Sequence, residues 1–234
     1  MIKAVFFDLY GTLAGFSPSR YEIQSSACRD FGIEVTPEGI LAGYALADAL
    51  MASQNSVRPL RILGTADRDG FFAEYERKIL QGSGVEVDAQ QALEIWRRVR
   101  SMPYEMARFD DVAAAMDILR LQGLTLGLIS NMNQRGDELT ESLGLDPYLD
   151  FAVTSLDVGA EKPHPPIFRA ALARADVGPD EAVHVGDQVA SDVEGARAVG
   201  IQPVLLDRDG TRPEFDDCPR IEGLMELPEL LASF

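Results

Sequence analysis

Five short apolar runs, each bounded by turn-forming residues, constrain the fold of this chain more than any other feature of its sequence. They cover residues 2–7, 124–129, 151–154, 182–185 and 201–206. Their hydrophobicity is continuous rather than alternating, a pattern typical of strands that are buried on both faces of a parallel sheet. Apolar stripes at helical spacing lie between them, over residues 112–119, 167–175 and 189–196. Strands that alternate with helices predict an α/β fold with a doubly wound parallel sheet.

The first two runs are separated by far more chain than one crossover connection needs. Most of this stretch, residues 16–108, carries helix signals and little strand signal. Thr36 and Asp88 have the residue types and the positions of helix N-caps. The sequence therefore predicts a helical insertion between the first strand and the rest of the sheet.

This pattern divides the chain into two expected domains. Residues 1–15 and 109–234 form an α/β core, and residues 16–108 form a helical cap domain over the sheet. The substrate would then be selected by side chains of the cap. Candidates for such contacts are Tyr21, Arg58, Arg61 and Arg98.

The charge balance limits the partners of the chain. Its 38 acidic residues outnumber the 21 basic ones and give a formal net charge of −17. Such a surface repels phosphate backbones and anionic headgroups, so we expect no nucleic-acid or membrane partner. Cys28 and Cys218 form no disulfide framework or metal-binding spacing, and the N-terminal apolar run is too short for a signal-peptide core. We expect a cytoplasmic protein, and nothing in the sequence indicates its oligomeric state.

Polar residues follow the apolar runs at the points where strands would end. Asp8 follows the first run, Ser130 and Asn131 follow the second, Lys162 comes shortly after the third, and Asp187 follows the fourth. Because ligands bind outside the carboxyl ends of the strands in open α/β sheets, we expect these side chains to converge on one site.

The charges of this site predict a metal. Asp8, Asp187 and Asp192 would bring three carboxylates together, against the single ammonium of Lys162. Buried like charges destabilise a protein unless they are compensated. A hard divalent cation with oxygen ligands provides that compensation, and Mg²⁺ also stabilises a phosphoryl group in transfer.

The motifs at these strand ends resemble those of a known superfamily. They read, in chain order, Asp8-x-Tyr10-Gly11-Thr12, Ser130-Asn131, Lys162-Pro163 and Gly186-Asp187-x-x-x-x-Asp192. In residue type and order they are similar to the four motifs of the haloacid dehalogenase-like superfamily, which has a Rossmann-like core. A single one of these motifs would be a weak signal, but four in the same order form a specific one.

The resemblance implies a role for each residue. Asp8 would be the covalent nucleophile, Ser130 would hold the transferring group, and Lys162 would neutralise charge on the nucleophile. Asp187 would bind Mg²⁺, and Asp192 would orient the surroundings of Asp187. The implied catalytic positions are Asp8, Tyr10, Thr12, Ser130, Asn131, Lys162 and Asp192, and the implied metal ligands are Asp8, the Tyr10 carbonyl and Asp187.

Tyr10 departs from the phosphatase pattern, in which this position is an Asp that protonates the leaving alkoxide. Tyrosine has a pKa of about 10 and cannot act as a base at neutral pH. L-2-haloacid dehalogenases carry Tyr at this position, because a halide leaves as an anion and needs no proton. Residues 39–51, however, lack the Arg that those enzymes place early in the cap, and Gly186-Asp187 supplies the metal ligand that their fourth motif lacks.

Two other features have structural interpretations. Residues 207–211 read Asp-Arg-Asp-Gly-Thr, closer to the phosphatase first motif than residues 8–12, but too little chain follows them for the later motifs. We interpret them as a turn after the last strand. His184 lies within an apolar run and is expected to be a core residue.

Taken together, these observations predict a hydrolase with an aspartyl nucleophile, most readily a Mg²⁺-dependent phosphatase of a small phosphorylated metabolite. Two alternatives remain open. One is a metal-free 2-haloacid dehalogenase, and the other is a non-catalytic binding protein that retains the fold.

Overall fold

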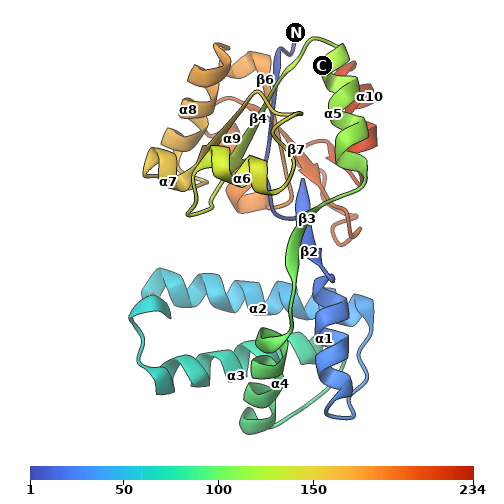
Figure 1. Cartoon of the computed structure of the whole chain (residues 1–234), viewed down its shortest axis with the longest axis vertical. Helices are drawn as coiled ribbons and strands as arrows, with labels where there is room; N and C mark the ends of the chain where they lie inside the picture. The colour runs from blue at the N-terminus through green and yellow to red at the C-terminus, as the bar shows by residue number, and fades with distance from the viewer. Residues whose placement is uncertain (59) are drawn as a thin grey trace. The chain divides into compact units, whose positions relative to one another are not determined.

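The computed structural model describes residues 1–58 and 60–234, without the side chains of residues 52, 55–57 and 61. It divides the chain into two compact units (Figure 1). The α/β unit comprises Met1–Gly15 and Met106–Phe234, and the helical unit comprises Phe16–Glu105. The chain passes from one unit to the other along β2 (Ala14–Ser17) and returns along β3 (Glu105–Arg108), which pair as a two-stranded sheet.

The α/β unit is built on a six-stranded parallel sheet in the order β5-β4-β1-β6-β7-β8. The strands are β1 (Ala4–Phe7), β4 (Thr125–Ser130), β5 (Phe151–Thr154), β6 (Ala182–Gly186), β7 (Gln202–Leu206) and β8 (Arg220–Ile221). The predicted fold class is confirmed, and each of the five apolar runs contains a strand. The sequence did not predict β8, because two residues that include an arginine form no apolar run. The 207–211 turn therefore lies between two strands rather than after the last one.

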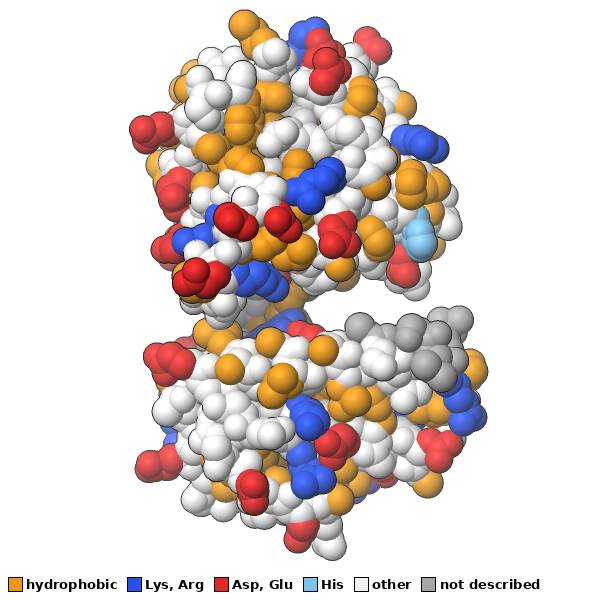
Figure 2. Space-filling view, turned by 180° about the vertical axis from the view of Figure 1, so that it is seen from behind, with side chains coloured by type: hydrophobic (Ala, Val, Ile, Leu, Met, Phe, Trp, Pro, Cys, Tyr) orange, Lys and Arg blue, Asp and Glu red, His pale blue; other side chains and the backbone are white. Residues whose placement is uncertain are grey.

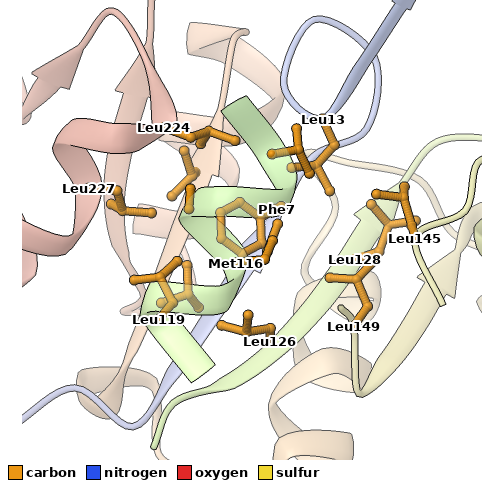
Figure 3. Packing of buried hydrophobic residues seen from close by; sticks show 14 of the residues in the cluster. Phe7, Leu13, Met116, Leu119, Leu126, Leu128, Leu145, Leu149, Leu224 and Leu227 are labelled. Atoms are coloured by element: carbon orange, nitrogen blue, oxygen red, sulfur yellow. The ribbon is translucent and has the colours of Figure 1, made fainter. Parts of the chain in front are cut away.

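Helices cover both faces of this sheet (Figure 1). On one face lie α5 (Asp111–Leu121), η4 (Leu224–Glu226) and α10 (Leu227–Leu231), whose apolar side chains pack on the strands (Figure 3). On the other lie α8 (Pro165–Ala175) and α9 (Glu194–Arg197). Successive residues of β1 alternate between the two cores: Val5 and Phe7 face the first, and Ala4 and Phe6 face the second. This explains why the strand is apolar at every position.

Shorter elements complete the unit. They are α6 (Gly136–Ser142), α7 (Ser155–Val158), η2 (Pro179–Glu181) and η3 (Val189–Val193). The stripe over residues 189–196 predicts a regular helix, but its first part is the π-helical turn η3. The amide groups of Asp192 and Val193 both donate to the Gln188 carbonyl, at 2.8 and 3.3 Å. This wider turn lets the Asp192 side chain accept a hydrogen bond from the Gln188 amide at 3.0 Å.

The helical unit consists of α1 (Arg20–Arg29), α2 (Pro37–Val57), η1 (Leu60–Ile62), α3 (Thr65–Gly82) and α4 (Ala89–Ser101). Both predicted N-caps are confirmed. The Thr36 side chain accepts a hydrogen bond from the Gly39 amide at 3.1 Å, and Asp88 accepts one from the Gln91 amide at 2.8 Å.

Two of the arginines that sequence analysis proposed for substrate contact form ion pairs inside the helical unit. Arg98 binds Asp30 at 2.7 Å, and Arg58 lies 3.8 Å from Asp67. The side chain of Arg61 lies outside the described part of the structure.

The surface of the chain is strongly charged. On the face that Figure 2 draws, basic side chains lie singly or in small groups among acidic ones on both units.

Within the described residues, no helix combines the length and the apolar character that a bilayer-spanning segment requires.

A buried carboxyl group stands out in the core of the helical unit. Glu76 of α3 has no exposed surface. Its Oε1 accepts a hydrogen bond from the Gln24 side chain, whereas its Oε2 has no partner in the described part of the chain. Burial raises the pKa of Glu76 from 4.5 to about 7, although the bond from Gln24 acts in the opposite direction.

We predict that Glu76→Gln removes a pH dependence of stability. The raised pKa means that folding favours neutral Glu76, so its contribution is fully present below pH 4.5 and is lost as the pH rises to about 7. The rise in pKa corresponds to roughly 3 kcal/mol at about 1.4 kcal/mol per pH unit. The difference in unfolding free energy between variant and wild type, measured in urea with Trp96 fluorescence, should therefore grow between these pH values. Parallel pH profiles would contradict the prediction.

Candidate active site

The strand order brings the polar strand-end residues to one edge of the sheet. Because β1 lies between β4 and β6, with Phe7 opposite both Leu128 and Val185, Asp8 emerges between the ends of its two neighbours. The Asp8 amide donates to the Val185 carbonyl at 2.9 Å, which fixes the start of its loop. Ser130 at the end of β4 is buried nearby.

Lys162 occupies the centre of this site. Its ammonium is buried and donates to Asp8 Oδ1 at 2.5 Å and to Asp192 Oδ1 at 2.6 Å. Burial by itself would lower the pKa of Lys162, but attraction to the two carboxylates outweighs it and raises this pKa above its usual value. Burial likewise acts to raise the pKa of Asp192, but Lys162 and a hydrogen bond from His184 hold it well below its usual range. For Asp8, burial dominates and the pKa is raised despite Lys162.

Asn131 holds the loop that carries Lys162. Its Oδ1 accepts a hydrogen bond from the Lys162 amide at 2.6 Å, and its Nδ2 donates to the Lys162 carbonyl at 3.0 Å. The two bonds together fix the backbone at Lys162. Asn131 therefore acts on the site by positioning the lysine.

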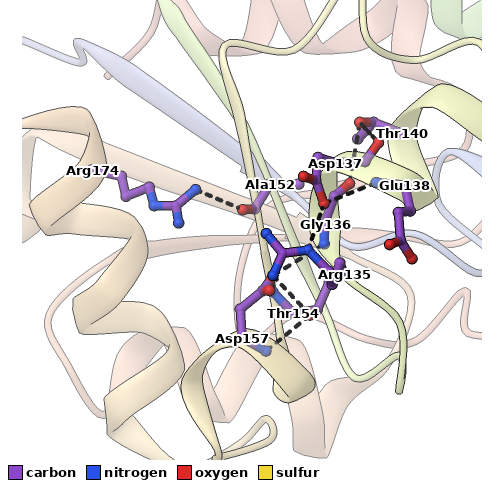
Figure 4. A network of polar contacts seen from close by, with 9 residues as sticks. All are labelled: Arg135, Gly136, Asp137, Glu138, Thr140, Ala152, Thr154, Asp157 and Arg174. Carbon is purple, nitrogen blue, oxygen red and sulfur yellow. Dashed lines mark hydrogen bonds and ion pairs between the residues drawn. The ribbon is translucent and has the colours of Figure 1, made fainter.

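A second polar network holds the loop that follows Asn131 (Figure 4). Asp157 Oδ2 accepts hydrogen bonds from the amide of Gly136 at 3.1 Å and from the hydroxyl of Thr154 at 2.9 Å. The Ser155 hydroxyl donates to the Met132 carbonyl at 3.0 Å. These bonds join the start of α6 and the β4–α6 loop to the end of β5, so that Ser130 and Asn131 have fixed neighbours.

His184 is a core residue, as expected, and it also contacts the site. It has no exposed surface, and its Nε2 lies 3.0 Å from Asp192 Oδ1. Sequence analysis missed this contact. The signal was available, because a histidine inside an apolar strand needs a polar partner when it is buried.

Asp187 is the carboxylate that this arrangement leaves uncompensated. Oxygen atoms of Asp8, Asp187 and Asp192 lie within 4.8 Å of one another. The buried Oδ1 of Asp187 has no hydrogen-bond partner within the described residues. Burial first, and then the charges of Asp8 and Asp192, raise the pKa of Asp187 to about 8. A buried oxygen without a partner, in an all-oxygen donor set, fits a hard divalent cation.

The remaining residues of the first motif differ in their surroundings. Tyr10 lines a cavity of about 120 Å³ together with Asp8, Ser130, Asn131 and Lys162. Thr12 is buried behind this loop, where its hydroxyl has no partner in the described structure. Of the residues implied at the site, Thr12 and Asp187 do not belong to the described lining of this cavity.

Comparison with known proteins assigns the family. A family model for haloacid dehalogenase-like hydrolases matches residues 2–200. The chain belongs to this family of hydrolases.

The similar proteins carry the names of different activities. The chain is 39% identical to haloacid dehalogenase-like hydrolase domain-containing protein 3 of Mus musculus, over 56% of the chain and 53% of the mouse protein, so it spans about half of that relative. It is 28% identical to the glyceraldehyde 3-phosphate phosphatase of Methanothermobacter thermautotrophicus, over 99% of the chain and all of that protein. A solved 2-haloacid dehalogenase of Pseudomonas syringae is 29% identical, with a TM-score of 0.56, over 100% and 99% of the two chains.

In this member of the family, the loop of residues 207–212 carries two arginines that bind backbone carbonyls at the site. It is a turn, as interpreted, in which Asp207 accepts hydrogen bonds from the amides of Thr211 and Arg212, at 3.0 and 2.8 Å. Arg208 donates to the Thr12 carbonyl at 2.8 Å, and Arg212 donates to the Asp187 carbonyl at 2.8 Å. Sequence analysis missed both arginines, because no local pattern indicates which distant carbonyls they reach.

Three residues that line the same small cavity were also missed. Met132, Gln188 and Ser191 lie along its wall. The Ser191 hydroxyl donates to the Gln188 side chain at 3.2 Å. Their residue types carry no signal by themselves, and only their closeness to Asp8 and Asp192 makes them candidates for substrate contact.

Gly11 is required by this geometry, which gives a test of the packing. Its φ is +83°, and a Cβ atom there would lie 2.5 Å from Asp187 Oδ2. Gly210 also has a positive φ, of +61°, but a Cβ there would meet nothing within 4 Å. We predict that Gly210→Ala costs about 1 kcal/mol from backbone strain alone, and that Gly11→Ala costs about 3 kcal/mol because the contact adds to the strain. Urea unfolding of both variants measures the difference, and equal losses would show that Asp187 does not closely approach Gly11.

Proposed function

We propose that this hydrolase is a Mg²⁺-dependent phosphatase of a small phosphorylated metabolite, and that its helical unit is a cap that selects the substrate. The observation that carries the proposal is the buried Asp187 oxygen without a partner, beside two further carboxylates. Lys162 already donates to Asp8 and Asp192, so the third carboxylate requires another positive charge.

Asp8, Asp187 and the Tyr10 carbonyl would hold the Mg²⁺ ion, because Asp192 is already bound to Lys162, His184 and the Gln188 amide. When bound, Mg²⁺ neutralises the charge that develops on the oxygens of the transferring phosphoryl group. Asp192 would then act through its contacts, by fixing the position of Lys162.

The chain's own residues account for the covalent steps of the proposal. Lys162 binds Asp8 Oδ1, which leaves Oδ2 to attack phosphorus. The bond between phosphorus and the ester oxygen breaks, and its electron pair departs with that oxygen. Water then attacks phosphorus in the acyl phosphate, which releases inorganic phosphate and restores the Asp8 carboxylate. Ser130 and Asn131 line the cavity in which the phosphoryl group would lie.

The glyceraldehyde 3-phosphate phosphatase among the relatives supports this proposal, since the match spans the whole of that protein. It acts on glyceraldehyde 3-phosphate, a small phosphorylated metabolite. Its identity to this chain, 28%, supports the reaction class more than the particular substrate.

A second candidate, hydrolytic 2-haloacid dehalogenation, is favoured by Tyr10 and by the similarity to the solved dehalogenase. Asp8 would displace halide from carbon, and water would hydrolyse the resulting ester. This route needs no proton donor at position 10 and no metal. It does not account for Asp187, whose buried Oδ1 would keep no hydrogen-bond partner among the described residues.

We expect Asp8→Asn to lower the turnover of an aryl phosphate by about 10⁴-fold or more, because an amide cannot serve as the nucleophile. Asp209→Asn is the matched control, since Asp209 is an exposed aspartate of the look-alike 207–211 loop. Turnover is measured with Mg²⁺ and with EDTA, and chloride release from a 2-chloro acid is measured in parallel.

The outcomes separate the alternatives. Turnover that requires both Asp8 and Mg²⁺ supports the phosphatase. Chloride release that needs Asp8 and persists in EDTA identifies a dehalogenase. A folded wild type that is inert toward both substrates would favour a binding protein, and normal turnover by folded Asp8→Asn would refute the nucleophile.

We also expect aryl and acyl phosphates to be cleaved faster than alkyl phosphates. Without a carboxylic acid at position 10, an alkoxide departs unprotonated, whereas a phenolate or a carboxylate departs readily. Tyr10→Asp should reduce the difference in rate between aryl and alkyl phosphates by up to about 10²-fold, because it restores a proton donor. Tyr10→Phe should leave this difference unchanged. A leaving-group series at fixed Mg²⁺ measures the difference. A flat series in wild type would mean that another group supplies the proton.

A further inference from the structure

The helical unit contains a cavity of its own, separate in its lining from the small cavity at Asp8. It has a volume of about 390 Å³, within the range of small-molecule sites. All of its described lining belongs to the helical unit. Aromatic residues dominate the wall: Phe16, Tyr44, Phe72, Tyr75, Trp96 and Tyr104.

The aromatic rings of this wall present flat apolar surfaces. Phe72 and Trp96 stack with centroids 4.0 Å apart and an interplanar angle of 19°. Phe16 and Tyr104 meet edge to face at 4.7 Å. Planar rings bind well against such walls, because aromatic groups prefer offset-stacked and edge-to-face contacts.

One polar group on the wall has an unused hydrogen-bonding atom. Glu76 is among the residues that line the cavity, and its side chain is fully buried. Gln24 of α1 donates to its Oε1 and also accepts a hydrogen bond from Tyr44 of α2 at 3.4 Å, whereas the buried Oε2 has no partner in the described part of the chain. A buried carboxylate with a free oxygen destabilises the fold unless a ligand uses it.

The charged groups that line the cavity define the character of the ligand further. Arg20 is held by Asp48 at 3.4 Å, and the Tyr75 hydroxyl donates to the same Asp48 at 2.8 Å. Arg68 and Arg100 line the cavity and are exposed, so they lie on its open side. An anionic substituent near these two guanidinium groups would be favoured.

We propose that this cavity binds an anionic molecule with a flat heteroaromatic ring that carries an N–H group. The ring lies against Phe72 and Trp96, its N–H donates to Glu76 Oε2, and its anionic group lies beside Arg68 and Arg100. Such a ligand satisfies the free oxygen, fills the aromatic space and matches the charge of the open side.

The chain supplies a reporter for this site, because Trp96 is its single tryptophan and lines the cavity. The probes are benzimidazole-5-carboxylate and its 1-methyl derivative, which lacks the N–H. Binding is followed by Trp96 fluorescence and by calorimetry at about pH 8.5, where Glu76 is ionised. We expect wild type to bind the N–H probe about tenfold more tightly, the effect of one hydrogen bond to a charged group.

Glu76→Gln tests the proposed contact directly. If its oxygen keeps the bond from Gln24, its amide NH₂ group replaces Oε2 and faces the N–H of the probe. The preference for the N–H probe should then disappear or reverse. Val99→Phe is a second variant that fills the cavity and should abolish binding of both probes, so the proposal remains testable if Glu76→Gln does not fold.

Arg100→Gln and Arg97→Gln form a matched pair on α4. Arg100 lines the cavity, whereas Arg97 binds Asp69 at 2.7 Å and does not belong to the described lining. We expect Arg100→Gln to lower the affinity for the N–H probe by about threefold or more and Arg97→Gln to leave this affinity unchanged. Absence of binding to wild type, equal affinity for the two probes, or an unchanged preference in folded Glu76→Gln would overturn the proposal.

The source of the natural ligand is decided by a separate measurement. If the N–H probe competes with substrate in the turnover assay, the cavity holds part of the substrate, and if turnover is unaffected, it holds a separate effector. Both results support the site. The binding measurements need no turnover, so the site can be tested with Asp8→Asn and stands or falls independently of the proposed phosphatase activity.

Discussion

The candidate active site of this hydrolase depends on the buried contacts of the Lys162 ammonium with Asp8 and Asp192. Removing three ions from water is unfavourable, so the arrangement requires close, well-directed bonds, at 2.5 and 2.6 Å from the lysine. Asn131 orients Lys162 through hydrogen bonds with both its backbone amide and its carbonyl. His184 and the Gln188 amide occupy the remaining positions around Asp192. Loss of Lys162 would leave both buried carboxylates without this ion pair.

Asp187 adds a third carboxylate to the cluster of Asp8, Asp192 and Lys162, and this carboxylate distinguishes the two candidate reactions. A dehalogenase needs the Asp8 and Lys162 pair but has no use for a further buried carboxylate. A phosphatase uses that carboxylate to hold a cation. In the loop of residues 207–212, Arg208 binds the Thr12 carbonyl and Arg212 binds the Asp187 carbonyl, on either side of the close approach between Gly11 and Asp187. The bond from Arg212 thus holds the backbone of Asp187 beside the site.

The helical unit also contains a buried ionisable group whose hydrogen bonds are incomplete. Glu76 is ionisable, buried and only half satisfied, so it lowers the stability of the folded unit as the pH rises. An apolar residue at position 76 would destabilise the folded unit less. A polar group of this kind is explained by a ligand that completes its hydrogen bonds, and the aromatic walls around it indicate the shape of that ligand.

The sequence by itself determined the parallel sheet, the helical insertion and the strand-end positions of Asp8, Ser130 and Asp187, because continuous apolar runs and the residues that end them are local features. It also implied the family, through four ordered motifs. Only the tertiary structure decided that Asn131 holds the Lys162 backbone, that His184 contacts Asp192, and that Arg208 and Arg212 hold the active-site loops. These contacts join residues 8 to 196 positions apart. They depend on strand order and on a π-helical turn, neither of which any local pattern specifies.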